Sequence, residues 1–169
     1  MKWYSILSYF LGGALFFIAG PALIIFLAGL CPYDFMPNNA ISSIFGAICS
    51  GVGLFFVIWA NYELITKGKG GALVIGQIKL CKETQKLVTT GPYSMCRNPM
   101  HMGIILFYLG LCCAINSLLT LLVPLAMLCF AYAFAIFLDE PRLKRDFKDE
   151  YLKWQIDVPQ RFWPKPKKI

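Results

Sequence analysis

Charged residues, histidine and paired cysteines are scarce in this sequence. Only 15% of its 169 residues are charged, His101 is its one histidine, and its seven cysteines form no Cys-x-x-Cys pair. A structural zinc site needs four close thiolate or imidazole ligands, and a disulfide framework needs a regular set of cysteines. The sequence therefore predicts neither a metal centre nor a disulfide-stabilised fold.

Apolar residues are abundant instead. They make up 58% of the chain, against about 45–50% in soluble domains. The net charge of +7 could indicate nucleic acid, but the basic residues flank apolar runs, which is typical of membrane proteins. We therefore expect a lipid bilayer, and no nucleic acid, as the partner of this chain.

Four apolar runs predict an all-α, polytopic membrane helix bundle in one domain, 1–169. The runs cover about 3–30, 40–65, 99–115 and 118–138, and about 20 residues cross a bilayer. A cleaved signal peptide is the alternative for the first run, which is longer than such peptides. Asn116-Ser117 leaves room only for a tight turn, so the third and fourth helices should form an antiparallel hairpin. Both open ends of that hairpin then face the polar segment 66–98.

Further patterns refine this bundle. In the second run two series of small residues recur every four positions and predict close helix packing: Ser42, Gly46, Ser50 and Ser43, Ala47, Gly51. The charge of Glu63, near the end of the second run, is explained by a surface ion pair with Lys67, four residues later.

After Pro141 one apolar stripe indicates an amphipathic helix that lies in the membrane interface or caps the bundle. The stripe consists of Leu143, Phe147, Tyr151, Trp154 and Val158.

The distribution of basic residues predicts the orientation. Lys2, segment 66–98 and the part after 138 contain all sixteen Lys and Arg, and the two opposite loops contain none. Both termini should therefore be cytoplasmic, in a bacterial inner membrane or the endoplasmic reticulum. The regions 66–98 and 139–164 would then form a cytoplasmic cofactor region.

Two polar stretches should meet at that cytoplasmic end. Asn98-Pro99 predicts a helix start with Asn98 as N-cap, and Arg97 precedes it. A helix N-terminus and a cation suit an anion, whereas Asp139 and Glu140 end the fourth run and suit a cation. S-adenosylmethionine carries both charges, with its carboxylate for Arg97 and its ammonium or ribose for Asp139 or Glu140. The alternatives are that Arg97 anchors lipid phosphate and that the acids pair with Arg142 or Arg145.

The second half of the chain resembles the isoprenylcysteine carboxyl methyltransferases and their phospholipid-methylating relatives. The resemblance rests on four blocks in family order: Leu87-Val88-Thr-Thr-Gly91-Pro92-Tyr93, Arg97-Asn98-Pro99-Met100-x-x-Gly103, Asp139-Glu140-x-x-Leu143, and Phe147-x-x-x-Tyr151-x-x-Trp154-x-x-x-Val158-Pro159. It implies a membrane methyltransferase that uses S-adenosylmethionine. The cofactor contacts that it implies are Lys86, Leu87, Val88, Tyr93, Asn98, Pro99, Met100, His101, Asp139 and Glu140.

The chain departs from that family pattern at several positions. His101 stands where the family usually has Tyr, and the acidic pair is Asp-Glu instead of Glu-Glu. The usual Val-Pro-Arg is here Val158-Pro159-Gln160-Arg161, so the arginine comes one position later. The turn Ala135–Leu138 lacks the arginine that prenylcysteine-methylating members carry, which counts against a prenylcysteine substrate. Methyl transfer from a sulfonium needs mainly positioning, so Glu140, His101 and Arg161 are candidate catalytic residues that orient a lipophilic or small acceptor.

Two other functions are open at this stage. A sterol-type reductase that uses NADPH resembles this C-terminal half, although a dinucleotide would need more cations and fewer acids. A small non-catalytic scaffold or transporter subunit would be expected to carry charges deep within its spans, and the sequence places none at mid-span.

Overall fold

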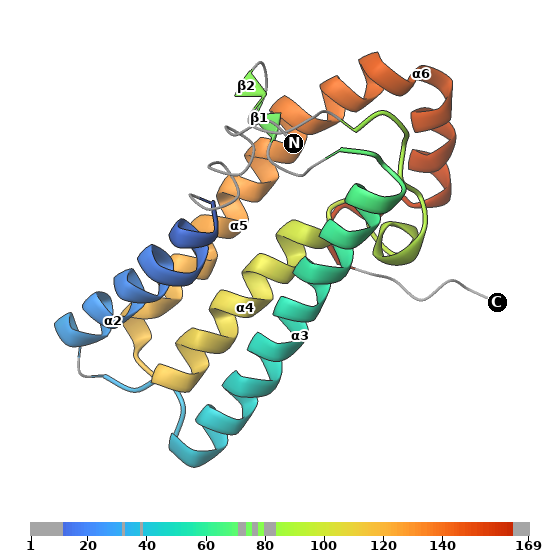
Figure 1. The fold of residues 1–169 in the computed structure, drawn as a ribbon. Helices are drawn as coiled ribbons and strands as arrows, with labels where there is room; N and C mark the ends of the chain where they lie inside the picture. Colours follow the sequence, from blue (N-terminus) through green and yellow to red (C-terminus); the bar gives the residue numbers. More distant parts are fainter. Residues whose placement is uncertain are drawn as a thin grey trace.

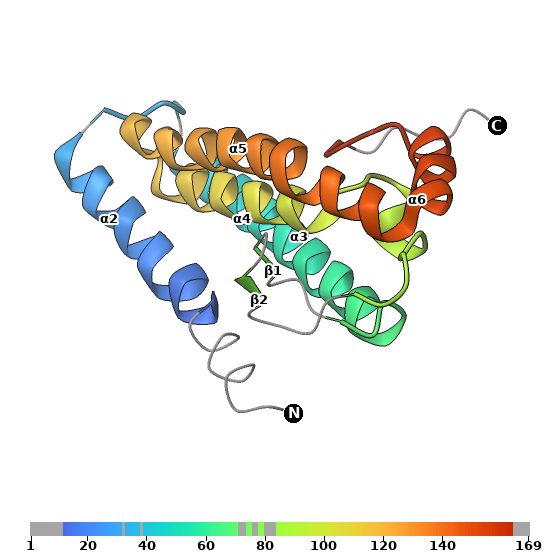
Figure 2. The ribbon, with the colours of Figure 1, turned by 90° about the horizontal axis from the view of Figure 1, so that it is seen from above.

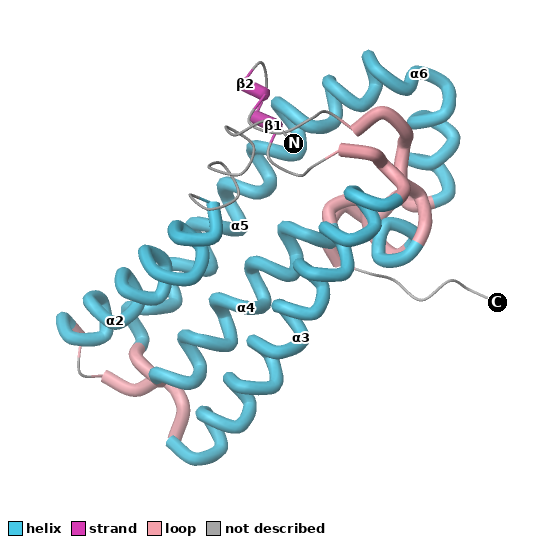
Figure 3. Tube along the Cα trace, viewed as in Figure 1, coloured by secondary structure: helices cyan, strands magenta, loops and turns pink. Residues whose placement is uncertain are grey.

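The structure, a computed structural model, describes residues 12–31, 33–37, 39–70, 74–75, 78–79 and 84–163, and these residues are mainly helical (Figure 1). The long helices are α2 (Gly20–Leu30), α3 (Asn39–Thr66), α4 (Pro99–Ile115), α5 (Leu122–Phe134) and α6 (Glu140–Asp157). Two-residue strands β1 (Val74–Ile75) and β2 (Ile78–Lys79) pair antiparallel. Figure 3 shows that loops gather at the two ends of the bundle.

The predicted bundle of membrane helices is confirmed. Gly12–Leu30, Ala40–Thr66 and the continuous stretch Leu118–Asp157 are long and apolar enough to cross a membrane. The helix α4 has 17 residues, about 26 Å at 1.5 Å per residue, which is slightly less than a bilayer core. The part of the first predicted span before residue 12 lies outside the described residues.

Small residues bring α3 and α4 into backbone contact. A Cβ on Gly46 would lie 2.5 Å from the carbonyl oxygen of Gly110, and one on Gly103 would lie 2.7 Å from that of Gly53. The hydroxyl of Ser42 donates to the carbonyl of Cys113 at 2.6 Å. One predicted small-residue series, which contains Ser42 and Gly46, therefore packs against α4.

The other small-residue series faces away from the bundle. Ser43, Ala47 and Gly51 are exposed, and a Cβ on Gly51 would meet no atom within 4 Å. The prediction that both series pack against a helix is therefore wrong within this chain, because residues one position apart point about 100° apart around a helix.

A proline in α2 explains a contact with α4. The turn η1 (Leu15–Ala19) is π-helical, and the N–H of Gly20 donates to the carbonyl of Leu15. In that pattern the next donor would be Pro21, which has no N–H, so the carbonyl of Phe16 lacks its helical partner. The hydroxyl of Tyr108 donates to that carbonyl at 2.7 Å.

The helix α5 continues into α6 through a second π-helical turn, η4 (Ala135–Asp139). Within α6, Lys148 has the non-helical dihedral angles φ 43° and ψ −118°. After this residue the second half of α6 turns across the end of the bundle (Figure 2). The predicted amphipathic helix is therefore present as two helical pieces. Its apolar stripe still packs inward, since Tyr151, Trp154 and Val158 are buried against α3 and the segment before α4.

Candidate active site

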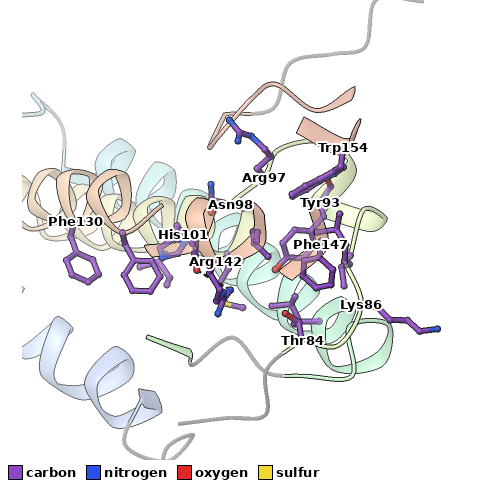
Figure 4. Close-up of a pocket in the computed structure, with 18 residues that line it drawn as sticks. Thr84, Lys86, Tyr93, Arg97, Asn98, His101, Phe130, Arg142, Phe147 and Trp154 are labelled. Atoms are coloured by element: carbon purple, nitrogen blue, oxygen red, sulfur yellow. Dashed lines mark hydrogen bonds and ion pairs between the residues drawn. The ribbon is translucent and has the colours of Figure 1, made fainter. Parts of the chain in front are cut away.

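A cavity of about 260 Å³ lies at the end of the bundle where α4 begins and α5 passes into α6 (Figure 4). Binding sites for small molecules usually enclose about 300–1,000 Å³, so this cavity is just below that range and suits a ligand of no more than about nucleoside size. Its lining combines polar groups with apolar and aromatic walls: Leu64, Thr84, Lys86, Leu87, Val88, Tyr93, Arg97, Asn98, Met100, His101, Ile104, Phe130, Phe134, Asp139, Arg142, Leu143, Phe147 and Trp154.

Behind the cavity, Glu140 is held by two arginines. Its carboxylate accepts from Nη1 of Arg97 at 2.9 Å and from Nε of Arg161 at 2.7 Å. Glu140 is 8% exposed and Arg97 7% exposed. Burial alone would raise the pKa of the Glu140 carboxyl, but the hydrogen bond from Arg161 and the charge of Arg97 outweigh it and hold that pKa below its usual value. The carboxylate of Glu140 therefore stays ionised at neutral pH.

The same arginine ties the C-terminal segment to the start of α4. Arg97 also donates to the hydroxyl of Tyr151 at 3.2 Å and to the carbonyl of Pro159 at 3.3 Å. The backbone N–H groups of Arg97 and Asn98 donate to the carbonyls of Gln160 and Arg161 at 2.9 and 2.8 Å. We call these pairings, with the bonds to Glu140, the Arg97 clasp.

The clasp changes the role of Asn98. The helix α4 begins at Pro99, as predicted, and Asn98 occupies the N-cap position. The predicted N-cap position of Asn98 is therefore confirmed. Its side chain makes no cap hydrogen bond, and its Nδ2 donates to the carbonyl of Arg161 at 3.2 Å.

Asp139, next to Glu140 in the chain, faces the cavity. Consecutive residues of a helix point in different directions. Asp139 therefore lines the cavity, whereas Glu140 contacts Arg97 and Arg161. Asp139 forms an ion pair with Arg142, in which Oδ1 lies 3.2 Å from Nη2. Burial raises the pKa of the Asp139 carboxyl to about 6, against the opposing effect of Arg142, so a further cation beside Asp139 would favour its ionised form.

One wall of the cavity is formed by the segment from Leu87 to Tyr93, and α3 holds it in place. Thr90 donates to Oε2 of Glu63 at 2.8 Å, and Lys67 donates to both Glu63 and Thr90 at 2.8 Å. Gly91 has φ +61°, and a Cβ there would lie 2.9 Å from the Glu63 carboxyl. The predicted ion pair between Glu63 and Lys67 is therefore confirmed, with the Lys67 side chain 53% exposed. Glu63 is only 6% exposed, and it also holds this wall.

The wall is also held from α6. The indole Nε1 of Trp154 donates to the carbonyl of Tyr93 at 3.2 Å. Burial, with the nearby charge of Asp139, raises the pKa of the Tyr93 hydroxyl well above its ordinary value. The Tyr93 hydroxyl is therefore neutral at physiological pH and is available as a hydrogen-bond donor.

His101 lies among aromatic rings on the side of the cavity that faces along the bundle. Its ring centroid is 5.5 Å from that of Phe134 and 6.4 Å from that of Phe162. Phe130, which stacks near Phe134 at 5.8 Å, lines the cavity although its side chain is 65% exposed. This end of the cavity therefore reaches the apolar outer surface of α5.

The cavity brings together most of the residues that the sequence singles out. Lys86, Leu87, Val88, Tyr93, Arg97, Asn98, Met100, His101 and Asp139 line it. Pro99, Glu140 and Arg161 do not line it. Five further lining residues were not predicted for the site from the sequence: Thr84, Phe130, Phe134, Phe147 and Trp154. Arg142 was expected only as an ion-pair partner of the acids. The position of Arg142, three residues after Asp139 on a helix, is the one signal that could have added it.

These features define a membrane helix bundle with a mixed polar and apolar cavity at one end. The family model for phospholipid methyltransferases matches residues 41–150, which is more than half of the chain. The chain therefore belongs to the phospholipid methyltransferase family, which also includes the isoprenylcysteine carboxyl methyltransferase-like membrane enzymes. No curated protein and no solved structure is significantly similar to it.

Family membership establishes what kind of protein this is. It is an integral membrane enzyme and a methyltransferase, and members of the family generally use S-adenosylmethionine as the methyl donor. The match covers the cavity wall, Arg97, Asn98, His101, Asp139 and Glu140, because all lie within residues 41–150.

Proposed function

We propose that this cavity binds S-adenosylmethionine and that the enzyme methylates a lipophilic acceptor, which reaches the cavity from the bilayer. The observation that carries the proposal is the mixed lining of the cavity. The Asp139–Arg142 ion pair and the exposed Phe130 both line it. A zwitterionic cofactor suits the charged pair, and an apolar acceptor suits the aromatic side chains that include Phe130.

The residues of the cavity fit the cofactor in charge and shape. Asp139 would bind its ammonium or ribose, and Leu87, Val88 and Met100 would pack against its adenine. Asn98 and Tyr93 offer hydrogen-bond donors on the same lining, which Lys86 also borders. Bound S-adenosylmethionine supplies an electrophilic methyl group on a sulfonium. The family resemblance also implies contacts from Pro99 and Glu140, which do not line the cavity. These two residues would hold the neighbouring lining residues in position.

Three residues were proposed to orient the acceptor, and their positions give them different tasks. His101 lines the cavity beside Phe134. An acceptor that reaches the cavity past Phe134 would meet the imidazole, which would take the proton of an amine or thiol. Glu140 and Arg161 are bonded to each other at 2.7 Å and would hold the floor of the cavity through the Arg97 clasp. A carboxylate acceptor would need no base.

The acceptor is proposed to be a lipid-soluble or small molecule, such as a phospholipid amine, a small thiol or an isoprenoid carboxylate. The residues before the acidic pair, Ala135 to Leu138, offer no cation for a prenylcysteine carboxylate. The positions of the basic residues support cytoplasmic termini and therefore a cavity that opens to the cytoplasm, where the cofactor is made.

Thermal unfolding in detergent would test the choice of cofactor. A ligand that binds only the folded protein raises its melting temperature, so we expect S-adenosylhomocysteine, the product form of the cofactor, to raise it in a concentration-dependent way. NADPH at the same concentrations should have no effect. Stabilisation by NADPH alone would contradict the proposal and would favour a sterol-type reductase.

A further inference from the structure

Within the proposed function, we infer that Arg142 binds the carboxylate of the cofactor, a role that the sequence suggested for Arg97. The Asp139–Arg142 pair would then bracket the amino-acid end of S-adenosylmethionine, with Asp139 at the ammonium and Arg142 at the carboxylate. The inference rests on the proposed function, because it concerns the same cavity and the same cofactor.

The other cations of the cavity lining are already paired or point away from it. Among the described residues, three Lys or Arg side chains line the cavity: Lys86, Arg97 and Arg142. Nη1 and Nη2 of Arg97 already donate to Glu140, Tyr151 and Pro159, so its buried Nε is the one guanidinium nitrogen without a partner among the described residues. Figure 4 shows Arg97 and Lys86 pointing away from the labelled cluster around His101, whereas Arg142 lies beside His101.

Moving Arg97 toward a ligand would also be costly. The Arg97 side chain is 6% exposed and its partner Glu140 10% exposed, so turning Arg97 toward a ligand would leave a buried carboxylate short of one partner. Separating a buried charge from its partner is strongly unfavourable. Arg142 and Asp139 are more accessible, at 18% and 17% side-chain exposure, and both face the cavity.

The spacing of the charges also fits the ligand. The ammonium and carboxylate of an amino acid are both attached to one carbon atom, so they lie as close together as the charges of the Asp139–Arg142 pair, which are 3.2 Å apart. A ligand with this head group can place each charge against the opposite charge of the pair. An arginine is suited to the task because its planar donors match a carboxylate.

Isothermal titration on the full-length protein in detergent tests the inference with two probes. One probe is S-adenosylhomocysteine, and the other is its decarboxylated analogue, which keeps the amine and lacks the carboxylate. We expect Arg142→Gln to bind S-adenosylhomocysteine between about 10- and 100-fold more weakly, and to bind the decarboxylated analogue no more weakly than wild type does. Arg145→Gln is the matched control, because Arg145 lies on the same helix with a side chain 72% exposed.

The outcomes separate this inference from the proposed function. An equal loss for both probes in Arg142→Gln would assign Arg142 a structural role, and no loss for either probe would show that it does not contact the carboxylate. Either result would overturn the inference. The proposed function would still stand if the wild-type protein binds S-adenosylhomocysteine. A wild-type protein that binds neither probe would overturn both.

A second comparison covers the case in which Arg142→Gln does not fold. Wild-type protein alone should bind S-adenosylhomocysteine at least about tenfold more tightly than the decarboxylated analogue. Equal wild-type affinities would overturn the inference without any variant.

Discussion

Arg97 and Glu140 are 43 residues apart in the sequence and form a buried ion pair with 2.9 Å between Nη1 and Oε1. This contact joins the start of α4 to the start of α6. Arg161 adds a second cation to the same carboxylate, so the C-terminal segment is fastened to both helices. The pair therefore fastens the start of α4 to α6 beside the cavity, which Arg97 lines and Glu140 does not.

The first prediction concerns this ion pair. Glu140→Ala leaves Arg97 buried without its main partner, and loss of one member of a buried pair costs about 3–5 kcal/mol. We expect a large fall in melting temperature in detergent. The control is Asp146→Asn, which breaks a contact with Arg145 whose side chain is 72% exposed and should change stability by less than about 1 kcal/mol. Equal effects of the two variants would contradict the role of the clasp.

The second prediction concerns pH. The pKa of Asp139 is raised to about 6 by burial, so lowering the pH through 6 protonates it and removes the negative charge that an ammonium ligand needs. The affinity for S-adenosylhomocysteine should fall about tenfold between pH 7 and pH 5. Glu140, whose pKa is lowered, should stay ionised over this range.

The variant Asp139→Asn tests the assignment of that pH dependence. It should bind more weakly at pH 7 and lose most of the change between pH 7 and pH 5. His101→Gln is the comparison, because His101 lines the same cavity. If the pH dependence persists in Asp139→Asn and disappears in His101→Gln, the titrating group is His101, and the role of Asp139 is contradicted.

The third prediction concerns the cavity wall. Gly91 has φ +61°, and a Cβ there would lie 2.9 Å from the Glu63 carboxyl. Gly91→Ala should cost about 1–2 kcal/mol from its backbone conformation alone and should displace the wall, so both stability and affinity for S-adenosylhomocysteine should fall. Gly29→Ala in α2, where a Cβ meets nothing within 4 Å, should leave both unchanged.

The fourth prediction concerns the contact between α3 and α4. A Cβ on Gly103 would lie 2.7 Å from the carbonyl oxygen of Gly53, and backbone atoms of two packed helices cannot move apart locally. Gly103→Ala should therefore destabilise the protein by about 1–3 kcal/mol, measured by thermal unfolding. Gly51→Ala on the outer face of α3, which meets nothing within 4 Å, is the control. A stable Gly103→Ala variant would show that the helices are further apart.

The helices could be predicted from the sequence because their signals are local. Hydropathy located the spans, Asn98-Pro99 located the start of α4, and Asn116-Ser117 located the turn of the hairpin. The bend of α6 could not be predicted, because Lys148 carries none of the glycine or proline signals that mark such a conformation. It follows from burial of Tyr151 and Trp154, which is a property of the whole fold.

The site could be predicted only in part. Adjacent acids in the sequence gave no indication that Asp139 would face the cavity and Glu140 the clasp. Likewise, Arg97 stands at a helix N-terminus, where a free cation is a reasonable expectation, but its partners come from residues 43 to 62 positions away. Those long-range contacts hold the Arg97 guanidinium against Glu140. Arg142 is therefore the cation that lies beside Asp139 in the cavity.

The central claim is tested most directly by transfer of labelled methyl groups from S-adenosylmethionine to a total lipid extract by the purified protein in lipid bilayers. The account predicts label in the organic phase with wild type and with Arg145→Gln, and greatly reduced label with Asp139→Asn. Label found only in water-soluble products would contradict a lipophilic acceptor, and equal activity of Asp139→Asn and wild type would contradict the proposed cofactor site.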